Sequence, residues 1–568
     1  MPEKGVRIAV IDVNTCVGPT LKCGLVCVPI CPEVRMGSEA IFIKDNGYAG
    51  INEDLCTGCG LCVKKCPTQA IKVIKLPKEP GDPFFRYGVN SFRLYDFTVP
   101  KEKAITGIIG RNGIGKSTLL GLLQGKLTPN LDGNASWEDF ESQHSGTEVL
   151  DFLRKVREKR LKVSVKPQDL EAISKLTYSV RELFSTIPGF SDSLVNDFDL
   201  TEVLDRKLKV LSGGELQRVA LAYALGREHD LLFVDEFTSF LDLKQRLNAI
   251  TKLNAHDNSI VVVEHDLTIL DYLAEQIVLL WGEPGAFGVL SKIKQVRNGI
   301  NQYFQGYLKE ENIRFRPYEI KINITNPGVF TGRDKISYSG FEVNHEDFNL
   351  KAEAGFLYFG EVIGILGENG IGKTTFAKKL SENNDFALKP QVLERTDSTV
   401  QDFFLNNKIN LTMEVTEKLE LARLLEKNMA ELSGGELQRV WIAKTLLQEC
   451  KARIFDEPSS FLDVEQRLET ANLIKRISKS TGVPSFVIDH DFLFIDMCCD
   501  RLVVFQGTPA KNGLASTPLS MKDGMNEFLK NIGITFRRDK DTGRPRVNKI
   551  GSQMDSEQKQ KNEYYYVD

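Results

Sequence analysis

The chain has 568 residues, of which 42% are hydrophobic and 26% are charged. Such proportions are ordinary for a globular protein, and at roughly 100–200 residues per domain the length predicts several domains. Lysine and arginine number 73 and aspartate and glutamate 77, so the net charge of −4 excludes a strongly basic protein but allows local basic patches. No apolar run reaches about 18 residues, and no long apolar segment follows the N-terminus, so we expect neither a membrane span nor a secretory signal.

Cysteine is concentrated near the N-terminus, where the first 66 residues hold eight of the eleven cysteines. The run from Cys56 to Pro67 has the spacing C-x2-C-x2-C-x3-C-P, which is typical of bacterial ferredoxins that bind [4Fe–4S] clusters. An earlier run, from Cys16 to Pro32, is more widely spaced but also ends in Cys-Pro. The eight residues are Cys16, Cys23, Cys27, Cys31, Cys56, Cys59, Cys62 and Cys66.

The two runs predict two [4Fe–4S] clusters that exchange a ligand, because the last cysteine of such a run usually binds the other cluster. Zinc is an alternative, although tetrahedral zinc sites favour pairs of C-x2-C over a triplet that ends in Cys-Pro. Structural disulfides are a second alternative, and they suit short secreted chains. The predicted ligand sets are Cys16, Cys23, Cys27 and Cys66 for one cluster and Cys31, Cys56, Cys59 and Cys62 for the other.

Two later segments, Gly110–Thr118 and Gly367–Thr375, match the phosphate-binding pattern G-x4-G-K-[ST]. Each follows a strand-like apolar run and precedes a helix-like one, which is the context that a P-loop requires. Glycine lets backbone N–H groups face phosphate oxygens, the lysine reaches the β- and γ-phosphates, and the next hydroxyl, of Ser117 or Thr374, can bind Mg²⁺. The predicted nucleotide ligands are Asn112, Gly113, Gly115, Lys116, Ser117 and Thr118, and Asn369, Gly370, Gly372, Lys373, Thr374 and Thr375.

Three further motifs follow each P-loop in the same order. They are an identical Leu-Ser-Gly-Gly-Glu-Leu-Gln-Arg-Val segment, an apolar strand that ends in Asp-Glu, and an apolar strand that ends in histidine. The first copy also carries an insertion at about 134–165, with helical spacing in its later part, which is either a surface excursion or a docking element for a polyanion. The motifs lie at 211–219 and 432–440, at Asp235-Glu236 and Asp456-Glu457, and at His265 and His490.

This order of motifs resembles the ATP-binding cassette ATPases that carry two cassettes in one chain. The resemblance implies that the aspartates hold Mg²⁺, the glutamates activate the attacking water and the histidines contact the γ-phosphate. It also implies that the glutamine of each Lys-Pro-Gln segment senses Mg²⁺ and the water. The residues in these roles are Asp235 and Asp456, Glu236 and Glu457, His265 and His490, and Gln168 and Gln391.

In this family the cassettes face head to tail, so the resemblance implies that each nucleotide is also bound by the signature serine and glycine of the other cassette. The implied groups are Lys116 with Ser433 and Gly435, and Lys373 with Ser212 and Gly214. Tyr87 lies ahead of the first P-loop, where an adenine-stacking aromatic residue is expected, and Tyr338 is its weaker counterpart. A core position is the alternative for both tyrosines.

A ferredoxin-like segment ahead of twin cassettes resembles subfamily E of the ATP-binding cassette proteins, the ribosome-recycling ATPases also called RNase L inhibitors. The resemblance covers essentially the whole chain and includes 85–92, 311–316 and 534–549, the last two of which correspond to hinges between the cassettes. The first cysteine run is looser than is usual in the subfamily and lacks its interspersed lysines. Phe237 also replaces the usual proline after the first Asp-Glu.

The expected fold class is therefore α/β, with two head-to-tail P-loop cassettes behind a small α+β ferredoxin-like domain that carries two [4Fe–4S] clusters. ATP, Mg²⁺ and the clusters are the expected cofactors. The expected divisions are 1–77 for the iron–sulfur domain, 78–297 for the first cassette, 298–325 for a hinge, 326–522 for the second cassette, and 523–568 for a C-terminal hinge segment and tail.

The resemblance implies a cytoplasmic ATPase that splits ribosomes into subunits after termination and assists initiation. Its partners would be the small ribosomal subunit, with its rRNA and protein, and termination, recycling and initiation factors, with no membrane. The chain would act as a monomer whose cassettes pair within it. Two other functions stay open, namely ATP-coupled electron transfer through the clusters and a soluble ATPase subunit of a transporter. The arginine-rich hinge could contact rRNA phosphates or pair with cassette carboxylates.

Overall fold

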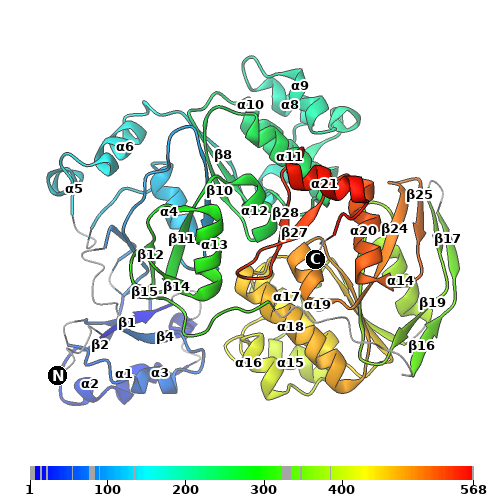
Figure 1. Ribbon diagram of the computed structural model, residues 1–568. Coiled ribbons are helices and arrows are strands. Elements are labelled where there is room, and N and C mark those ends of the chain that lie inside the picture. The colour runs from blue at the N-terminus through cyan, green and yellow to red at the C-terminus, as the bar shows by residue number, and fades with distance from the viewer. Residues whose placement is uncertain are drawn as a thin grey trace.

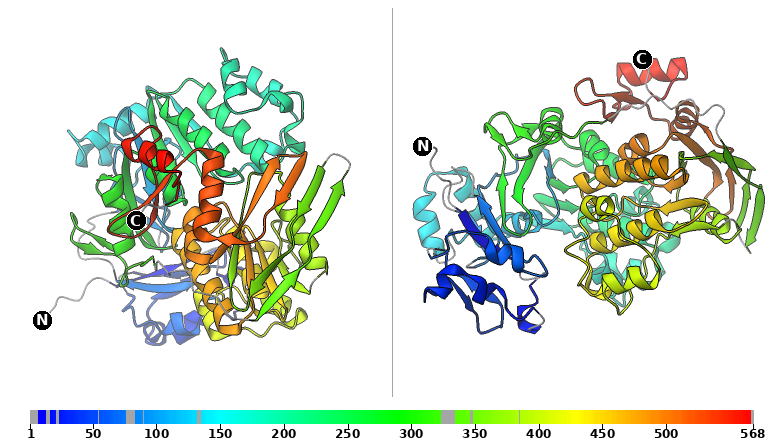
Figure 2. Two further views of the ribbon diagram at one scale, coloured as in Figure 1. Left: turned by 45° about the vertical axis from the view of Figure 1, so that its right-hand side comes forward. Right: turned by 90° about the horizontal axis from the view of Figure 1, so that it is seen from below.

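The structure is a computed structural model that describes residues 7–12, 16–20, 23–53, 55–75, 83–88, 90–131, 135–322, 334–345, 348–383 and 385–565. It contains a small N-terminal unit, two large α/β units of the same topology, and a C-terminal segment that lies across both (Figures 1 and 2). The expected boundaries at 77/78 and 325/326 fall outside the described residues. Among the residues in these ranges, no helix has the length and apolar character needed to span a membrane.

The N-terminal unit combines two antiparallel strand pairs with three short helices, as expected for an α+β ferredoxin-like fold. Its core is small, and Cys27, Cys31 and Cys62 are buried in it beside Ile11 and Ile51. The pairs are β1 (Arg7–Ile11) with β4 (Ile71–Lys75) and β2 (Ile41–Ile43) with β3 (Ala49–Ile51), and the helices are α1 (Cys27–Ile30), α2 (Pro32–Arg35) and α3 (Leu61–Lys65), after a 3-10 turn at Gly18–Thr20.

The first α/β unit is organised around a nine-stranded sheet whose central strands are parallel. These strands are buried and apolar because helices cover both faces. The carboxyl ends of parallel strands meet at one edge, so the segments after β7, β9 and β10 converge there. In spatial order the strands are β5 (Phe85–Arg86), β6 (Arg93–Tyr95), β12 (Phe287–Leu290), β11 (Gln276–Glu283), β7 (Ile105–Ile109), β10 (Ser259–Val263), β9 (Leu231–Asp235) and β8 (Val163–Lys166), and β13 (Lys294–Gln295) pairs with β11.

Most helices of this unit begin at a polar N-cap side chain. Ser212 and Asp242 each form a capping box, in which two backbone N–H groups of the first turn are satisfied. The helices are α4 (Lys116–Leu123), α5 (Trp137–Gln143), α6 (Glu148–Arg157), α7 (Glu171–Ser174), α8 (Val180–Ser185), α9 (Asp192–Asp197), α10 (Gly213–Gly226), α11 (Leu243–Asn254), α12 (Leu267–Leu273) and α13 (Val296–Gln305), with 3-10 turns at Thr201–Val203 and Leu208–Val210.

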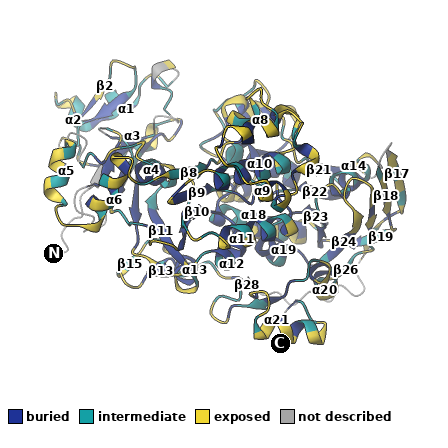
Figure 3. Ribbon diagram, turned by 90° about the horizontal axis from the view of Figure 1, so that it is seen from above, coloured by how far each residue is buried: buried dark blue, intermediate teal, exposed yellow. Residues whose placement is uncertain are grey.

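The insertion forms α5 and α6, so the helical spacing in its later part predicted a real helix. Helix α6 buries Leu150, Leu153 and Val156 and keeps its polar face outward. Arg157 at its end lies 4.6 Å from the ring centroid of Trp137 in α5, which joins the two helices. The exposed residues of both helices lie on the outside of the molecule, away from the buried strands (Figure 3).

The second α/β unit repeats the first strand for strand. The order of its sheet is β17 (Phe341–His345), β18 (Phe348–Ala352), β25 (Asn512–Ala515), β24 (Arg501–Thr508), β20 (Val362–Leu366), β23 (Ser485–Ile488), β22 (Ala452–Asp456) and β21 (Phe386–Lys389), with β26 (Leu519–Ser520) on β24 and a separate pair of β16 (Lys335–Tyr338) and β19 (Gly355–Tyr358). Its helices are α14 (Lys373–Asn383), α15 (Val400–Asn406), α16 (Met413–Lys418), α17 (Gly434–Leu447), α18 (Val464–Thr481), α19 (Phe492–Cys498) and α20 (Met521–Ile532), with a 3-10 turn at Met429–Glu431.

Two expected domain boundaries fall inside helices. The boundary at 297/298 lies in α13, which packs on β11, and the boundary at 522/523 lies in α20, which packs on β24. Each helix therefore belongs to the sheet that precedes it. After α13 comes the short pair β14 (Tyr307–Leu308) and β15 (Ile313–Arg314), which precedes the connection to the second unit.

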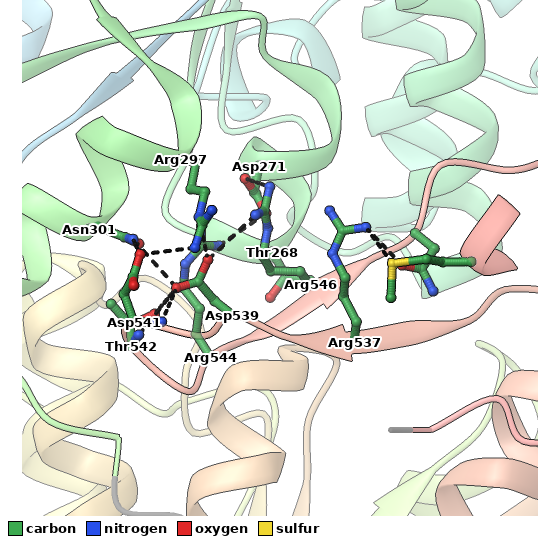
Figure 4. A network of polar contacts seen from close by, with 12 residues as sticks. Thr268, Asp271, Arg297, Asn301, Arg537, Asp539, Asp541, Thr542, Arg544 and Arg546 are labelled. Carbon is green, nitrogen blue, oxygen red and sulfur yellow. Dashed lines mark hydrogen bonds and ion pairs between the residues drawn. The ribbon is translucent and has the colours of Figure 1, made fainter. Parts of the chain in front are cut away.

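The C-terminal segment is a hairpin of β27 (Phe536–Arg538) and β28 (Pro545–Val547) followed by α21 (Gln553–Lys561). It binds both α/β units, and Figure 4 shows its contacts with the first. Arg544 and Arg546 donate to Asp271 on α12 of the first unit, at 3.1 and 2.6 Å. Arg538 donates to Asp496 on α19 of the second unit at 3.1 Å. The hairpin thus connects the two helices that directly follow His265 and His490.

Other charged groups of the two hinge segments are also paired within the chain. Asp539 accepts from Arg297 on α13 at 3.0 Å, and Asp541 accepts from the same guanidinium at 2.9 Å. In the preceding hinge, Arg316 is buried and donates to Glu465 of the second unit at 2.6 Å. For these arginines the structure favours intramolecular pairing over contact with rRNA.

We predict that Asp271→Ala lowers the thermal unfolding midpoint strongly. Arg544 is only 1% exposed and loses its carboxylate partner, and an unpaired buried charge costs about 3–5 kcal/mol. Asp541→Ala is the matched control, because Asp541 and its partner Arg297 are largely exposed and such a pair contributes about 0–1 kcal/mol. Equal midpoints for the two variants in calorimetry would contradict the conclusion that buried ion pairs hold the hairpin against the first unit.

Candidate nucleotide and iron–sulfur sites

The first P-loop connects β7 to α4 and places Lys116 at the helix N-terminus. The Lys116 ammonium donates to the carbonyl oxygens of Gly110 and Arg111 at 2.9 and 3.1 Å, and it lies 3.2 Å from Nε2 of His265. Gly115 has φ 102°, and a Cβ there would lie 2.4 Å from the Phe92 ring. Only glycine fits this turn, which leaves the loop N–H groups free to face an anion.

The acidic groups of the first site come from the neighbouring strands. Asp235 ends β9, and Glu236 follows it. The Glu236 carboxylate accepts a hydrogen bond from Gln168 at 2.7 Å and lies 3.5 Å from His265 Nε2. The sequence motifs of Lys116, Gln168, Glu236 and His265, which are far apart in the chain, therefore converge at one edge of the sheet.

Electrostatics separates the two neighbouring carboxyl groups. Burial, with the adjacent charge of Glu236, raises the pKa of Asp235 to about 7. Burial would also raise the pKa of Glu236, but the hydrogen bond with His265 and the charges of His265 and Lys116 outweigh it and lower that pKa to about 2. Burial and the Lys116 charge lower the pKa of His265. The Asp235 carboxylate is thus buried without enough positive charge nearby to balance it, as expected of a ligand for a divalent cation.

The second site has the same parts in a different hydrogen-bond pattern. Lys373 donates to the carbonyl oxygens of Gly367 and Glu368 at 2.9 and 2.7 Å. Thr374 donates to Asp456 at 2.8 Å, a bond that the described part of the chain does not repeat between Ser117 and Asp235.

The carboxylate of Glu457 accepts hydrogen bonds from Gln391 at 2.8 Å and from Ser460 at 3.0 Å. Nε2 of His490 is buried and has no hydrogen-bond partner among the residues that the structure describes. The second histidine therefore does not contact its P-loop lysine in the way that His265 contacts Lys116.

The two candidate adenine-stacking tyrosines differ in exposure. Tyr87 is 57% exposed, and its hydroxyl lies 3.2 Å from the Thr118 hydroxyl at the first P-loop. Tyr338 is 3% exposed and packs edge-on against Phe376 and Phe486. The structure therefore places Tyr87 beside the first site, while Tyr338 is a core residue.

The two α/β units meet head to tail at the P-loops. The backbone N–H of Asn112 donates to Asp463 of the second unit at 3.0 Å, and the backbone N–H of Asn369 donates to Asp242 of the first unit at 2.9 Å. The aspartates lie in the Phe-Leu-Asp segments that follow each Asp-Glu strand. Each P-loop is thus held by a carboxylate from the opposite unit, and we call this contact surface the seam.

The two Leu-Ser-Gly-Gly-Glu segments, which we call the signature segments, lie next to the Phe-Leu-Asp segments of the seam. Ser212 and Ser433 are the N-caps of α10 and α17. A Cβ on Gly214 would lie 3.0 Å from the carbonyl oxygen of Phe240, which accepts a hydrogen bond from the Asn369 side chain at 2.9 Å. The equivalent Cβ on Gly435 would lie 2.8 Å from the Phe461 carbonyl oxygen. Each signature helix therefore points toward the P-loop of the other unit.

The eight N-terminal cysteines form the two expected groups. Cys16, Cys23, Cys27 and Cys66 surround one cavity of about 20 Å³, with Val26 and other apolar side chains in its wall. Burial, followed by the charges of Cys23, Cys66 and Cys16, raises the pKa of Cys27 to about 11. Thiolates crowded in an apolar cavity require cationic compensation, which iron would supply.

The second group shows the same pattern. Burial raises the pKa of Cys62 to about 11, and the charges that add to this effect are those of Cys56, Cys59 and Cys31. Cys31 therefore lies with the later run, and Cys66 lies with the earlier one. The thiols are therefore grouped in the way that the predicted ligand exchange requires.

The N-terminal unit is bound to the first α/β unit beside the nucleotide site. Glu53 accepts hydrogen bonds from Arg86 at 3.0 Å and from Arg93, and these arginines flank Tyr87. Lys72 donates to Glu283 at 2.8 Å and to the Pro284 carbonyl at 3.1 Å. The Pro284 turn lies against the first P-loop, because the N–H of Gly285 donates to the Gly113 carbonyl at 2.9 Å.

Lys166 and Lys389 are not among the predicted site residues. Both are buried, and both bind the backbone of the Asp-Glu segment. Each is the lysine of a Lys-Pro-Gln segment at the end of an apolar strand. A charged residue at this position in both cassettes was the sequence signal that could have identified them.

Comparisons with known protein families support these parts of the structure. A family described as ABC transporter matches residues 93–239 and 387–460, and one described as 4Fe-4S binding domain matches residues 49–72. An uncharacterized ABC transporter ATP-binding protein of Methanocaldococcus jannaschii is 44% identical over 99% of this chain and 98% of its own length. Translation initiation factor rli1 of Schizosaccharomyces pombe is 37% identical over 100% of both chains.

Solved structures give the same result. The structure named "Model of ribosome-bound archaeal Pelota and ABCE1" contains a chain that is 42% identical, covers 99% of this chain and 100% of its own, and has a TM-score of 0.93. An archaeal ribosome recycling factor, aABCE1, in complex with the ribosomal stalk protein aP1, is 44% identical over 86% of this chain and 100% of its own, with a TM-score of 0.80. The expected fold class is confirmed. The chain belongs to the ABCE subfamily of ATP-binding cassette proteins, as an ATP hydrolase with two ABC domains and a 4Fe–4S binding domain.

Proposed function

We propose that this protein is a cytoplasmic ATPase that separates ribosomal subunits after termination and assists initiation. The observation that carries the proposal is the seam, in which two P-loops are each held by the opposite cassette while an iron–sulfur unit is bound beside one of them. A relative is named as a translation initiation factor, and one of similar fold is named as ribosome-bound. The partners would be the small ribosomal subunit and the termination, recycling and initiation factors.

The nucleotide contacts follow from the P-loop geometry. Lys116 and Lys373 would exchange their carbonyl partners for phosphate oxygens, and the loop N–H groups would complete the phosphate contacts. Asp235 and Asp456, with Ser117, Thr374, Gln168 and Gln391, would hold Mg²⁺, which supplies charge neutralisation at the β- and γ-phosphates when it is bound. Ser212 and Gly214 would complete the second site, and Ser433 and Gly435 the first.

Hydrolysis would depend on Glu236 and Glu457. A pKa of about 2 keeps the Glu236 carboxylate ionised, so it can accept a hydrogen bond from the attacking water. Gln168 and His265 orient that carboxylate from two sides, as Gln391 and Ser460 orient Glu457. His265 and His490 would contact the γ-phosphate, and Tyr87 would stack on adenine at the first site.

Closure of the seam would be transmitted to the iron–sulfur unit through its two attachment points. Glu53 is bound to the arginines that flank Tyr87, and Lys72 is bound to the turn that supports Gly113. Movement of either nucleotide-site segment therefore displaces the iron–sulfur unit as a rigid body. This mechanism would use ATP for mechanical work on the ribosome, with conformational change driven by differential binding of the closed state.

We propose that the N-terminal unit carries two [4Fe–4S] clusters. The four thiols of the first set line one cavity, and among the described residues no three of them come close enough to hold a single metal ion, which favours a cubane over zinc. The clusters would stiffen the arm and would not transfer electrons. The predicted division of the chain is 1–77, 78–297 with the insertion, 298–325, 326–522 and 523–568. Because α13 and α20 pack on the preceding sheets, we propose that the first cassette extends to Gln305 and the second to Ile532.

We predict that Glu236→Gln combined with Glu457→Gln traps the ATP-bound, closed form. Water activation is lost while the phosphate contacts persist, so hydrolysis should fall by about 10²-fold or more. Stoichiometric ATP retention and small-angle scattering would measure the trap. Glu283→Gln is the control, because this exposed glutamate binds Lys72 and touches no predicted phosphate ligand. An open form in excess ATP would contradict the assignment.

We predict that Cys31→Ser and Cys66→Ser each disturb the cluster of the opposite run. Cys31→Ser should remove the spectroscopic signature of the cluster on Cys56, Cys59 and Cys62, and Cys66→Ser should remove that of the other. Iron content and Mössbauer or EPR spectra of the reduced protein would measure the loss. Cys450→Ser is the control outside the unit. If each variant lost the cluster of its own run, the exchanged ligand sets would be wrong.

We predict that the iron-loaded protein dissociates ribosomes in the presence of ATP. Sucrose-gradient sedimentation of purified ribosomes would show free subunits with the native chain. With the doubly substituted Gln variant, it would show the protein bound to intact ribosomes, or subunits from at most one round of separation. Ribosome binding that does not respond to ATP would contradict the proposal. ATP-dependent cluster reduction without subunit separation would instead support electron transfer, and ATP-dependent co-sedimentation with membranes would support transport.

A further inference from the structure

Two fully buried lysines remain outside the mechanism described so far. Lys166 ends β8 and is 0% exposed, and Lys389 ends β21 and is 1% exposed. Neither is paired with a carboxylate side chain within ion-pair distance in the described chain. A buried ammonium is retained only where its donors are used.

Their donors bind the backbone of the Asp-Glu segments. Lys166 Nζ donates to the carbonyl oxygens of Asp235 and Glu236 at 2.7 and 3.1 Å. Lys389 Nζ donates to those of Asp456 and Glu457 at 2.6 and 3.0 Å. The two cassettes, which differ in their histidine contacts, agree in this arrangement.

A second donor reaches the same glutamate carbonyl from the signature helix. Gln217 Nε2 donates to the Glu236 carbonyl at 2.7 Å, and Gln438 Nε2 donates to the Glu457 carbonyl at 2.6 Å. Both glutamines are 1% exposed. Each glutamate carbonyl is therefore fixed by one donor from the strand that leads to the Lys-Pro-Gln glutamine and by another from the helix that begins at the signature serine.

This fixation coincides with backbone strain. Glu236 has φ 44° and Glu457 has φ 50°, which is the left-handed region that a residue with a Cβ avoids. Their N–H groups donate to the carbonyl oxygens of Val263 and Ile488, the residues that precede the histidine segments, at 2.9 and 2.8 Å. Such a conformation costs roughly 1–3 kcal/mol and persists only where surrounding bonds determine it.

We propose that Lys166 and Lys389 are positioning residues that hold the catalytic glutamates in this left-handed conformation and so aim their carboxylates at the attacking water. The inference rests on the proposed role of Glu236 and Glu457. The lysine acts on the peptide carbonyl of the glutamate, and the glutamine two residues after the lysine orients the glutamate side chain. One strand end thus controls both the backbone and the carboxylate of the same residue.

Lys166→Met combined with Lys389→Met tests the proposal in the full, iron-loaded chain. Methionine fills a similar volume without a donor. We expect kcat for ATP hydrolysis to fall about tenfold or more while KM for ATP changes less than about threefold, because the phosphate contacts remain. Lys162→Met is the control at the other end of β8, since Lys162 is exposed and bound to Glu228, and it should leave kcat unchanged.

A background without the glutamate carboxylates separates positioning from a general loss of structure. If the lysines act through the glutamates, adding the two methionines to Glu236→Gln and Glu457→Gln should not lower the residual single-turnover rate further. A loss of the same size in both backgrounds, a rise in KM that equals the fall in kcat, or a native kcat would each overturn the inference.

Two further measurements keep the test decisive. Should the methionine variants unfold at the assay temperature, Gln217→Leu with Gln438→Leu removes the other donor to the same carbonyl without changing a charge, and it should lower kcat selectively. A normal kcat in that folded variant would overturn the inference. The proposed function fails separately: if Glu236→Gln with Glu457→Gln hydrolysed ATP normally, the glutamates themselves would be assigned wrongly.

Discussion

Two hydrogen bonds across the seam make each P-loop depend on the opposite cassette. Asp463 uses one carboxylate oxygen to cap α18 through the Gln466 N–H and the other to accept from the Asn112 N–H. Both bonds, against the effect of burial, lower the pKa of Asp463. One side chain therefore caps a helix in its own cassette and binds the P-loop of the other, so an open seam leaves the Asn112 N–H without this acceptor.

The same seam produces two sites that are not equivalent. Arg111 of the first P-loop faces Glu420 and Glu465 of the second cassette, whereas Glu368 of the second P-loop faces Lys244 of the first. At the first site, His265 contacts Lys116 and Glu236. At the second site, the Thr374 hydroxyl instead donates a hydrogen bond to Asp456. Different contacts around the same motifs therefore give the two sites different geometries.

Sequence patterns could predict most of the site because its motifs lie at strand ends, and parallel strands bring such ends together. They could also predict the grouping of Cys31 with the later run and of Cys66 with the earlier one, since the Cys-Pro spacing carries that information. They could not predict that Lys166 binds backbone carbonyls, because a carbonyl has no residue-type signature. The domain ends at α13 and α20 were missed for a related reason, since packing on a preceding sheet depends on tertiary contacts.

The ends of the seam are tied to the two parts of the chain that lie outside the cassettes. At one end, Glu53 and Lys72 attach the iron–sulfur unit to segments that border the first P-loop. At the other, Asp271 and Asp496 attach the C-terminal hairpin to α12 and α19. These helices begin two residues after His265 and His490. Interior packing shifts between discrete arrangements and does not deform continuously. Under the proposed function, a conformational change at either nucleotide site would therefore move the iron–sulfur unit and the C-terminal hairpin together. Arginine–carboxylate pairs that are buried or bidentate are present at both ends, at Glu53, Asp271 and Asp496, and such pairs hold their partners in a fixed geometry.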